Sequence, residues 1–161
     1  MSQHCETWVP FGTTLAIITK KYFGALGAAI NDMPIDRYYT ILLFLENKQH
    51  PVSQQCIADY FLIDKTQMVR IMDFLISNTM ISKAINPTNR REYLVSLTQK
   101  AKAMLPQLKK AINETHNVLF EGFSESEKTT FFEQLSKISN NLNGLNKVSM
   151  SMQLIPVKPK P

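Results

Sequence analysis

Four polar side chains, Lys65, Thr66, Gln67 and Arg70, lie within two helical turns of one another in the stretch IDKTQMVRIMDFLISN, residues 63–78. Their chemistry is directional hydrogen bonding rather than bond making. A glutamine amide can pair with an adenine edge through two hydrogen bonds, and an arginine guanidinium can pair with guanine in the same way. This set of donors and acceptors suits the edges of nucleic-acid bases.

The same stretch has the apolar spacing of a helix that packs on one side. Its apolar residues recur at intervals of three and four positions: Met68, Ile71, Met72 and Leu75. Asp64 precedes the helix and can cap it, and Gln67 can return a hydrogen bond to complete a capping box. Gln67 therefore has two alternative uses, one at the helix end and one toward a partner.

A second short helix is predicted just before this one, over residues 54–61 with Ser53 as its N-cap. Ser53 and Gln54, at the start of this helix, are included among the candidate DNA contacts. Only three residues separate the two helices, which predicts a helix-turn-helix, although Leu62 occupies a turn in which glycine is common. Cys56, beside Ile57, is interpreted as a small packing residue.

After the helix the apolar pattern changes to the alternation of β-strands, on both sides of a Pro-Thr-Asn turn. The pattern predicts a β-hairpin, with Arg90 and Arg91 at its tip. A guanidinium can enter a narrow minor groove, where the negative potential is enhanced. A helix-turn-helix followed by such a hairpin is a winged helix.

Helical periods return on both sides of this unit, in residues 10–30, 35–47 and 98–123 and in a last helix capped by Ser124 and Glu127. Pro106 either kinks its helix or divides it in two. We expect a mainly α fold, a winged helix-turn-helix with a β-hairpin wing flanked by N- and C-terminal dimerisation helices. The expected boundaries are 1–33 for the N-terminal helix, 34–98 for the winged domain, 99–149 for the C-terminal helices and 150–161 for an irregular tail.

The positive charge is concentrated in one part of the chain. The formal charge is +5 over 161 residues, and residues 65–102 alone hold seven basic side chains against two acidic ones. The remainder of the chain is therefore neutral overall. A basic cluster favours an anionic partner, and phosphate contacts would make the affinity depend steeply on salt.

Three long amphipathic helices remain outside the winged segment and must bury their apolar stripes. An exposed apolar face of that size favours self-association, so we expect a two-fold symmetric homodimer. A monomer with an intramolecular helical cap is the alternative. A dimer would present two winged units to a pseudo-palindromic double-stranded DNA whose half-sites lie about one helical turn apart.

The segment SQQCIADYFLIDKTQMVRIMDFLISNTMISKAINPTNRREYLVSLTQKAK resembles the MarR family of transcriptional regulators, with a likeness from about Asp36 to Ala101. The most specific parts are DKTQMVRIMDFL, the arginine pair in NRR, and VSLTQK. The resemblance implies that Thr66, Gln67 and Arg70 make recognition-helix contacts and that Arg91 enters the minor groove. It also implies dimerisation through the terminal helices.

The sequence departs from the family pattern at three positions. Asn89 stands where an acidic residue usually holds the tip arginine, and it brings no charge. Thr79 replaces the glycine common after the recognition helix, and Ala101 replaces the one common after the last strand. Asn89 is nevertheless included among the candidate DNA contacts.

The resemblance implies further that a small apolar or phenolic effector binds between the dimer helices and the winged lobe and releases the DNA. Candidate contacts are the aromatic residues Trp8, Phe11, Tyr22, Tyr38 and Tyr39, although aromatics at helical spacing are more often core residues. A second branch of the family senses oxidants through an N-terminal cysteine, so Cys5 beside His4 is a candidate redox site.

Other classes of function find less support. Glycine-rich phosphate loops, nucleophile elbows and paired-histidine zinc motifs are missing from the sequence, so we predict no enzyme, no cofactor and no metal site. A winged helix that docks a protein instead of DNA is the stronger rival, and the clustered charge argues against it. With two cysteines, no signal-like N-terminus and no apolar span of about 20 residues, the expected location is the cytoplasm.

Overall fold

The computed structural model describes residues 10–35 and 38–143. The chain divides into two compact units. The central unit is Ala25–Asn113, and the terminal unit is formed by the chain on either side of it.

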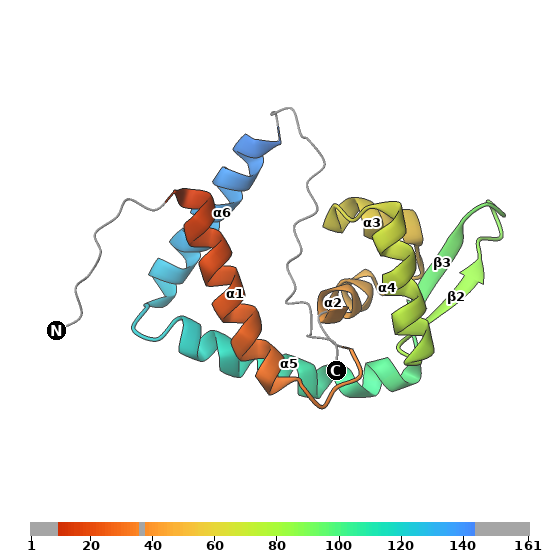
Figure 1. Ribbon diagram of the computed structural model, residues 1–161, viewed down its shortest axis with the longest axis horizontal. Helices are drawn as coiled ribbons and strands as arrows, with labels where there is room; N and C mark the ends of the chain where they lie inside the picture. The colour runs from red at the N-terminus through yellow and green to blue at the C-terminus, as the bar shows by residue number, and fades with distance from the viewer. Residues whose placement is uncertain (1–9, 36–37, 144–161) are drawn as a thin grey trace, which may run out of the picture. The chain divides into compact units, whose positions relative to one another are not determined.

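Helices make up most of the described chain (Figure 1). The elements in chain order are α1 (Phe11–Ala29), α2 (Tyr39–Lys48), β1 (Val52–Ser53), α3 (Gln54–Phe61), α4 (Lys65–Ser77), β2 (Ile81–Ile85), β3 (Tyr93–Leu97), α5 (Gln99–Leu119) and α6 (Glu125–Leu142). The expected mainly α winged helix-turn-helix architecture is confirmed.

The core of the central unit is apolar throughout. Side chains from every element of the unit enter it, and among the most deeply buried are Leu26, Ile41, Leu42, Ile57, Met68, Ile71, Met72, Leu75, Val95 and Leu108. The four apolar residues of the predicted α4 stripe are all buried. Burying each large aliphatic side chain stabilises the fold by about 1.5–3 kcal/mol, so this stripe fixes which side of α4 faces outward.

The sheet of the central unit has three antiparallel strands in the order β1-β3-β2. Val52 pairs with Val95, and on the other side of β3 Ile85 pairs with Tyr93. Val95 is completely buried, whereas Ile85 and Tyr93 are exposed. The hairpin therefore extends beyond the core, and Figure 1 shows it projecting past α4.

Helix α5 continues through Pro106 as a single helix. A proline removes the hydrogen bond to the carbonyl four residues earlier, here that of Lys102. Pro106 and Lys102 are both exposed, so water can satisfy the orphaned carbonyl. The proline is therefore not a boundary between two helices, which was one of the two expected alternatives.

Three described non-glycine residues of the central unit adopt the left-handed conformation, and one of them, Gln49 after α2, has φ of 57°. Leu62, between α3 and α4, has φ of 54°, and Thr79, after α4, has φ of 60°. These are two of the positions at which the sequence lacks an expected glycine. A β-branched residue fits this conformation poorly, so Thr79 stores local strain.

Thr79→Gly is expected to stabilise the protein. Relief of the left-handed strain, worth about 1–2 kcal/mol, outweighs the entropy that glycine adds to the unfolded chain, about 0.5–1 kcal/mol. Thermal unfolding should show a Tm higher by roughly 1–4 °C. Thr66→Gly makes the same chemical change at a helical position of α4 and should lower Tm; a fall in Tm for both variants would contradict the assignment of strain to Thr79.

An aromatic cluster lies in the terminal unit. The Tyr22 hydroxyl of α1 shares a hydrogen bond of 3.1 Å with His116 Nε2 of α5. Phe120 then packs against His116, Phe123, Phe131 and Phe132, with ring centroids 5.5–6.3 Å apart. These contacts join α1, the end of α5 and α6.

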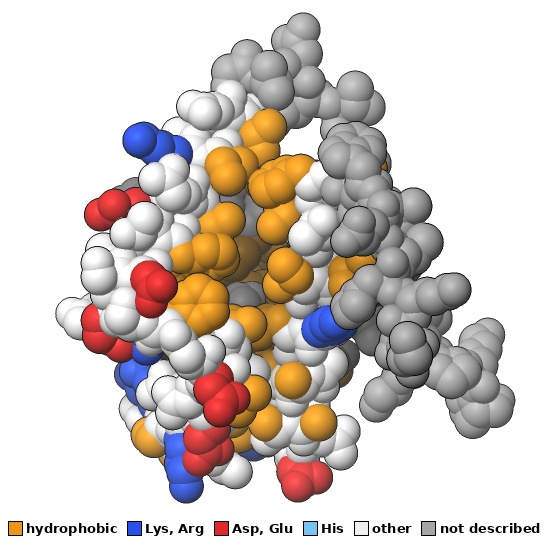
Figure 2. All heavy atoms as spheres, turned by 90° about the vertical axis from the view of Figure 1, so that its left-hand side faces the viewer, with side chains coloured by type: hydrophobic (Ala, Val, Ile, Leu, Met, Phe, Trp, Pro, Cys, Tyr) orange, Lys and Arg blue, Asp and Glu red, His pale blue; other side chains and the backbone are white. Residues whose placement is uncertain are grey.

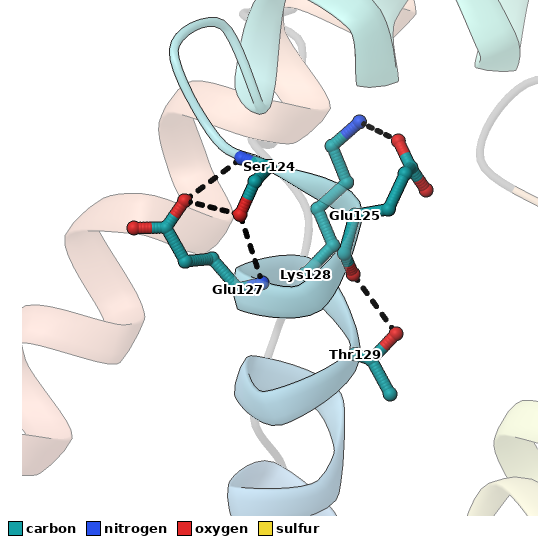
Figure 3. A network of polar contacts seen from close by, with 5 residues as sticks. All are labelled: Ser124, Glu125, Glu127, Lys128 and Thr129. Carbon is teal, nitrogen blue, oxygen red and sulfur yellow. Dashed lines mark hydrogen bonds and ion pairs between the residues drawn. The ribbon is translucent and has the colours of Figure 1, made fainter.

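Helix α6 begins with a complete capping box (Figure 3). The Glu127 amide donates to Ser124 Oγ at 3.3 Å, and Glu127 Oε2 accepts from Ser124 N and Oγ at 2.8 and 2.7 Å. This confirms the cap expected from the sequence. The hydrogen bonds from Ser124, led by the one from its side chain, lower the pKa of Glu127 below its ordinary value.

The stability of α6 should therefore depend on pH through Glu127. A carboxyl group whose pKa is lowered by folding adds stability at neutral pH, and this contribution is lost as the pH falls through its folded pKa. Glu127→Gln should thus be less stable than the parent at pH 7, with a difference that shrinks once the pH falls below 4.5, the ordinary pKa of this carboxyl group, and is lost through its lowered folded pKa. Amide hydrogen exchange in α6 measures this, and Glu133→Gln, lacking the cap, is the matched control. An equal difference at pH 7 and at acid pH would contradict it.

Apolar side chains also lie on the outside of the terminal unit. Those at least one-third exposed are Phe11, Leu15, Ile17, Ile18, Val118, Leu119, Phe123, Phe131, Phe132, Ile138 and Leu142. Figure 2 shows apolar side chains gathered over the face that α1 and α6 present to the viewer. No residue of α6 is buried. We call these eleven residues the terminal apolar face.

Among the described residues, no helix combines the length and the apolar character that a membrane span requires.

Candidate nucleic-acid interface

Three of the four predicted contact residues of α4 are exposed on the side of the helix that faces away from the core. Lys65, Thr66 and Arg70 are exposed, and Gln67 is half-buried. The apolar stripe on the opposite side sets this orientation. All four lie in the first two turns of the helix, the part of a recognition helix that reaches base edges.

The N-terminus of α4 is capped by one side chain. Asp64 Oδ1 accepts a hydrogen bond of 2.9 Å from the Gln67 amide. The return bond from the Gln67 side chain is not formed within the described chain, so the expected capping box is only half present. The side-chain amide of Gln67 therefore makes no capping bond within the described chain.

Ser53 is the N-cap of α3. Ser53 Oγ accepts from the Cys56 amide at 3.1 Å, so the hydroxyl is committed as an acceptor and keeps its O–H as a donor. Gln54, at the first position of α3, is half-buried. Cys56 is exposed, and its interpretation as a packing residue was wrong, because the core side of α3 is taken by Ile57 and Ala58.

The wing tip is held by asparagine side chains. Asn86 Oδ1 accepts from the amide and the hydroxyl of Thr88 at 3.0 and 2.8 Å, and Asn86 Nδ2 donates to Glu92 Oε2 at 3.1 Å. Asn89 Oδ1 accepts from the Arg91 amide at 3.2 Å. Asn86 was missed as a functional candidate, although asparagine before Pro-Thr is a recognised signal of a side-chain-stabilised turn.

Asn89 therefore acts on the backbone of Arg91 rather than on its guanidinium. In the family pattern an acidic residue is expected to hold the guanidinium through its charge. Asn89 instead holds the backbone of Arg91 in the turn through the Arg91 amide. The side chain of Arg91 stays exposed. The wing thus presents a hydrogen-bonded turn that carries two exposed arginine side chains, Arg90 and Arg91.

The arginines that the structure describes in the central unit face solvent without internal neutralisation. Arg70, Arg90 and Arg91 are exposed, and none of them is in an ion pair with any residue of the described chain. Glu92, the nearest acid in sequence, is engaged by Asn86. Exposed cations on two neighbouring elements make an electropositive surface, which we call the α4–wing surface.

Three of the four described aromatic effector candidates contact other side chains or lie in the core of their own unit, and the fourth is exposed. In the terminal unit Tyr22 bonds His116, and Phe11 is exposed. In the central unit Tyr38 packs edge-on against Phe74 at 5.3 Å between ring centroids, and Tyr39 is only 5% exposed. Trp8 and the redox candidate Cys5 lie outside the described residues. No group of three potential metal ligands occurs among the described residues.

Comparison with solved structures finds the same arrangement of elements. A MarR transcriptional regulator from Methanosarcina mazei Go1 matches with a TM-score of 0.73 at 23% identity, covering 83% of this chain and 97% of that one. The transcriptional repressor CouR, bound to a 23-mer DNA duplex, matches with a TM-score of 0.73 at 22% identity, covering 81% and 92%. The chain has the MarR fold. No protein-family model matches the sequence.

A third structure with the MarR fold is a mutant MarR from E. coli in complex with operator DNA. It matches with a TM-score of 0.72 at 20% identity and covers 81% of this chain and 94% of that one. In the MarR fold of this chain, α3 and α4 are the two helices of the helix-turn-helix, and β2 and β3 form the wing. The α4–wing surface therefore consists of the second helix of this helix-turn-helix and the wing.

Proposed function

We propose that this protein is a sequence-specific double-stranded DNA-binding transcriptional regulator. The observation that carries the proposal is the α4–wing surface, where Arg70, Arg90 and Arg91 are exposed and unpaired within the described chain. Two structurally similar proteins, CouR and the E. coli MarR mutant, were solved on DNA. Their complexes support DNA as the partner of this surface.

Each element of the surface has a proposed role. Arg70 and Gln67 read base edges in the major groove, while Lys65 and Thr66 bind phosphates or bases beside them. Arg91 enters the minor groove, and Arg90 contacts the backbone next to it. Ser53, Gln54 and Asn89 position the complex through contacts to the DNA backbone.

The terminal apolar face supports a homodimer as the DNA-binding form. A self-complementary apolar surface is buried most simply by a second copy related by a two-fold axis. Dimerisation doubles the number of α4–wing surfaces, so the proposed target is a pseudo-palindrome with half-sites about one helical turn apart. The terminal helices would then have dimerisation as their main task.

We further propose that the protein acts as a repressor released by a small apolar or phenolic effector. CouR, a structural neighbour, is described as a transcriptional repressor, which supports this direction of regulation. An effector that binds the DNA-free form better than the DNA-bound form would lower the affinity for DNA by that difference.

Selection from random duplex DNA with the purified protein tests the proposal. We expect a recovered motif that is pseudo-palindromic, bound with an affinity that falls steeply between low and moderate salt. Recovery of no motif would overturn the proposal and favour a protein-docking winged helix instead. Repeating the binding measurement with phenolic compounds then tests effector release.

A further inference from the structure

One exposed residue of α4 does not share the polar character of its neighbours. Val69 is 45% exposed and lies three residues after Thr66 and directly before Arg70, both of which are also exposed. Residues three and four apart are neighbours on a helix surface. Val69 therefore lies on one flank of the outward side of α4, beside Thr66 and Asp73 and next to buried Met72.

A valine at this position gains little from folding. Single exposed apolar residues are common on protein surfaces, but a β-branched side chain is a weaker helix former than the lysine, glutamate or glutamine usual on a solvated face. Its χ1 is nearly fixed in a helix. Val69 thus holds two methyl groups in a defined direction on the side that faces the proposed groove.

The major groove offers few apolar groups to such a side chain. Base edges there present hydrogen-bond donors and acceptors, and the C5-methyl group of thymine is the apolar exception. An apolar side chain within the groove is therefore complementary to thymine. Beside cytosine or a purine it would cover polar atoms without pairing them, which is unfavourable.

Val69 and Ile76, the two exposed apolar residues of α4, differ in their distance from the N-terminal end of the helix. Ile76 is 39% exposed and lies about 10 Å further along the helix, at 1.5 Å per residue. Because the N-terminal turns of a recognition helix reach the base edges, Val69 is within reach and Ile76 is beyond it.

We propose that Val69 reads the C5-methyl group of a thymine in each half-site and sets specificity at that base pair. The inference rests on the proposed function, and it adds a base identity and a residue that the polar contacts do not supply. It adds an apolar contact on the flank of α4 that carries Lys65 and Thr66.

Replacing single thymines of the selected duplex by deoxyuridine tests the contact, because it removes one methyl group and leaves base pairing unchanged. The parent should bind one such duplex about three- to fivefold more weakly, the effect expected for one buried methyl group. Val69→Ala should bind the thymine and deoxyuridine duplexes equally. Ile76→Ala, an equivalent exposed truncation on the same helix, should keep the full sensitivity of the parent.

The possible results distinguish failure of the Val69 contact from failure of the proposed DNA-binding function. The inference is overturned, and the proposed function stands, if the parent selects a duplex but binds its thymine and deoxyuridine forms equally tightly. The same holds if Val69→Ala loses as much affinity as the parent when thymine is replaced by deoxyuridine. If the parent binds no duplex selectively, both are overturned. Thermal unfolding of each variant checks that binding differences do not arise from misfolding.

Discussion

Arg70→Ala is expected to weaken binding to the selected duplex by about 10- to 100-fold. A bidentate contact from arginine to guanine is worth about 1–3 kcal/mol of discrimination, and about 1.4 kcal/mol corresponds to a factor of ten. Arg70 is exposed and has no ion-pair partner in the described chain, so its loss removes the DNA contact without breaking an internal one. The fold should be unchanged.

Titration of a labelled duplex at several salt concentrations measures the effect. The Arg70→Ala variant should lose its preference at one base pair, whereas Arg91→Ala on the wing should weaken binding and lower its dependence on salt. Lys137→Ala removes the same charge from the exposed surface of α6 and is the matched control. If Arg70→Ala and Arg91→Ala both bind as tightly as the parent, the regulator proposal fails.

A double replacement on the terminal apolar face, Ile18→Glu with Leu142→Glu, is expected to convert the proposed dimer into a monomer. Both residues are exposed, at 48% and 51%, and neither takes part in the aromatic cluster around Phe120. Two-fold symmetry would place four new carboxylates in one interface. Since burying unpaired charge costs several kcal/mol, the dimer should dissociate at micromolar concentration.

The DNA affinity of this double variant should fall by more than about 100-fold, because a monomer loses the second half-site and with it the gain from bivalent binding. Sedimentation analysis gives the oligomeric state, and duplex titration gives the affinity. Ile85→Glu introduces charge at an exposed apolar residue of the wing and should leave the dimer intact. A parent protein that sediments as a monomer would contradict the proposal outright.

The sequence alone predicts the helix-turn-helix closely, and the reason is physical. Helices α3 and α4 each carry a capping residue and a stripe of apolar side chains. Residues within each helix or next to it therefore determine where the helix starts and which of its sides is buried. The capping box of α6 was predicted for the same reason. Periodicity and caps are local signals, and they are strong here.

Other features depend on contacts that sequence patterns do not display. Strand β1 is only Val52–Ser53, too short to show an alternating period, and it exists because β3 offers it a partner. The continuity of α5 through Pro106 depends on which side of the helix faces solvent. Cys56 was placed inside because cysteine is usually buried, but a neighbouring isoleucine does not determine its side of the helix.

In the candidate site, too, some features could be predicted from the local sequence and others could not. The exposure of Lys65, Thr66 and Arg70 follows from the apolar stripe opposite them, so it was predictable. The use of Asn89 was not, because its side chain bonds the Arg91 amide instead of replacing a carboxylate. Whether Gln67 closes the capping box depends on a side-chain rotamer, which the residue type leaves open.

The division of the chain has a consequence for its biosynthesis. The central unit is one continuous segment, Ala25–Asn113, whereas the terminal unit needs residues from both sides of it. A ribosome adds about 5–20 residues per second, so the whole central unit is made before α6 exists. The winged helix can therefore fold during translation, while the terminal apolar face is completed only after α6 has been made. Nascent chains would then acquire the α4–wing surface before they complete the terminal apolar face, which is the proposed dimer interface. A chain truncated after α5 would keep the α4–wing surface and lack the part of that face that α6 supplies.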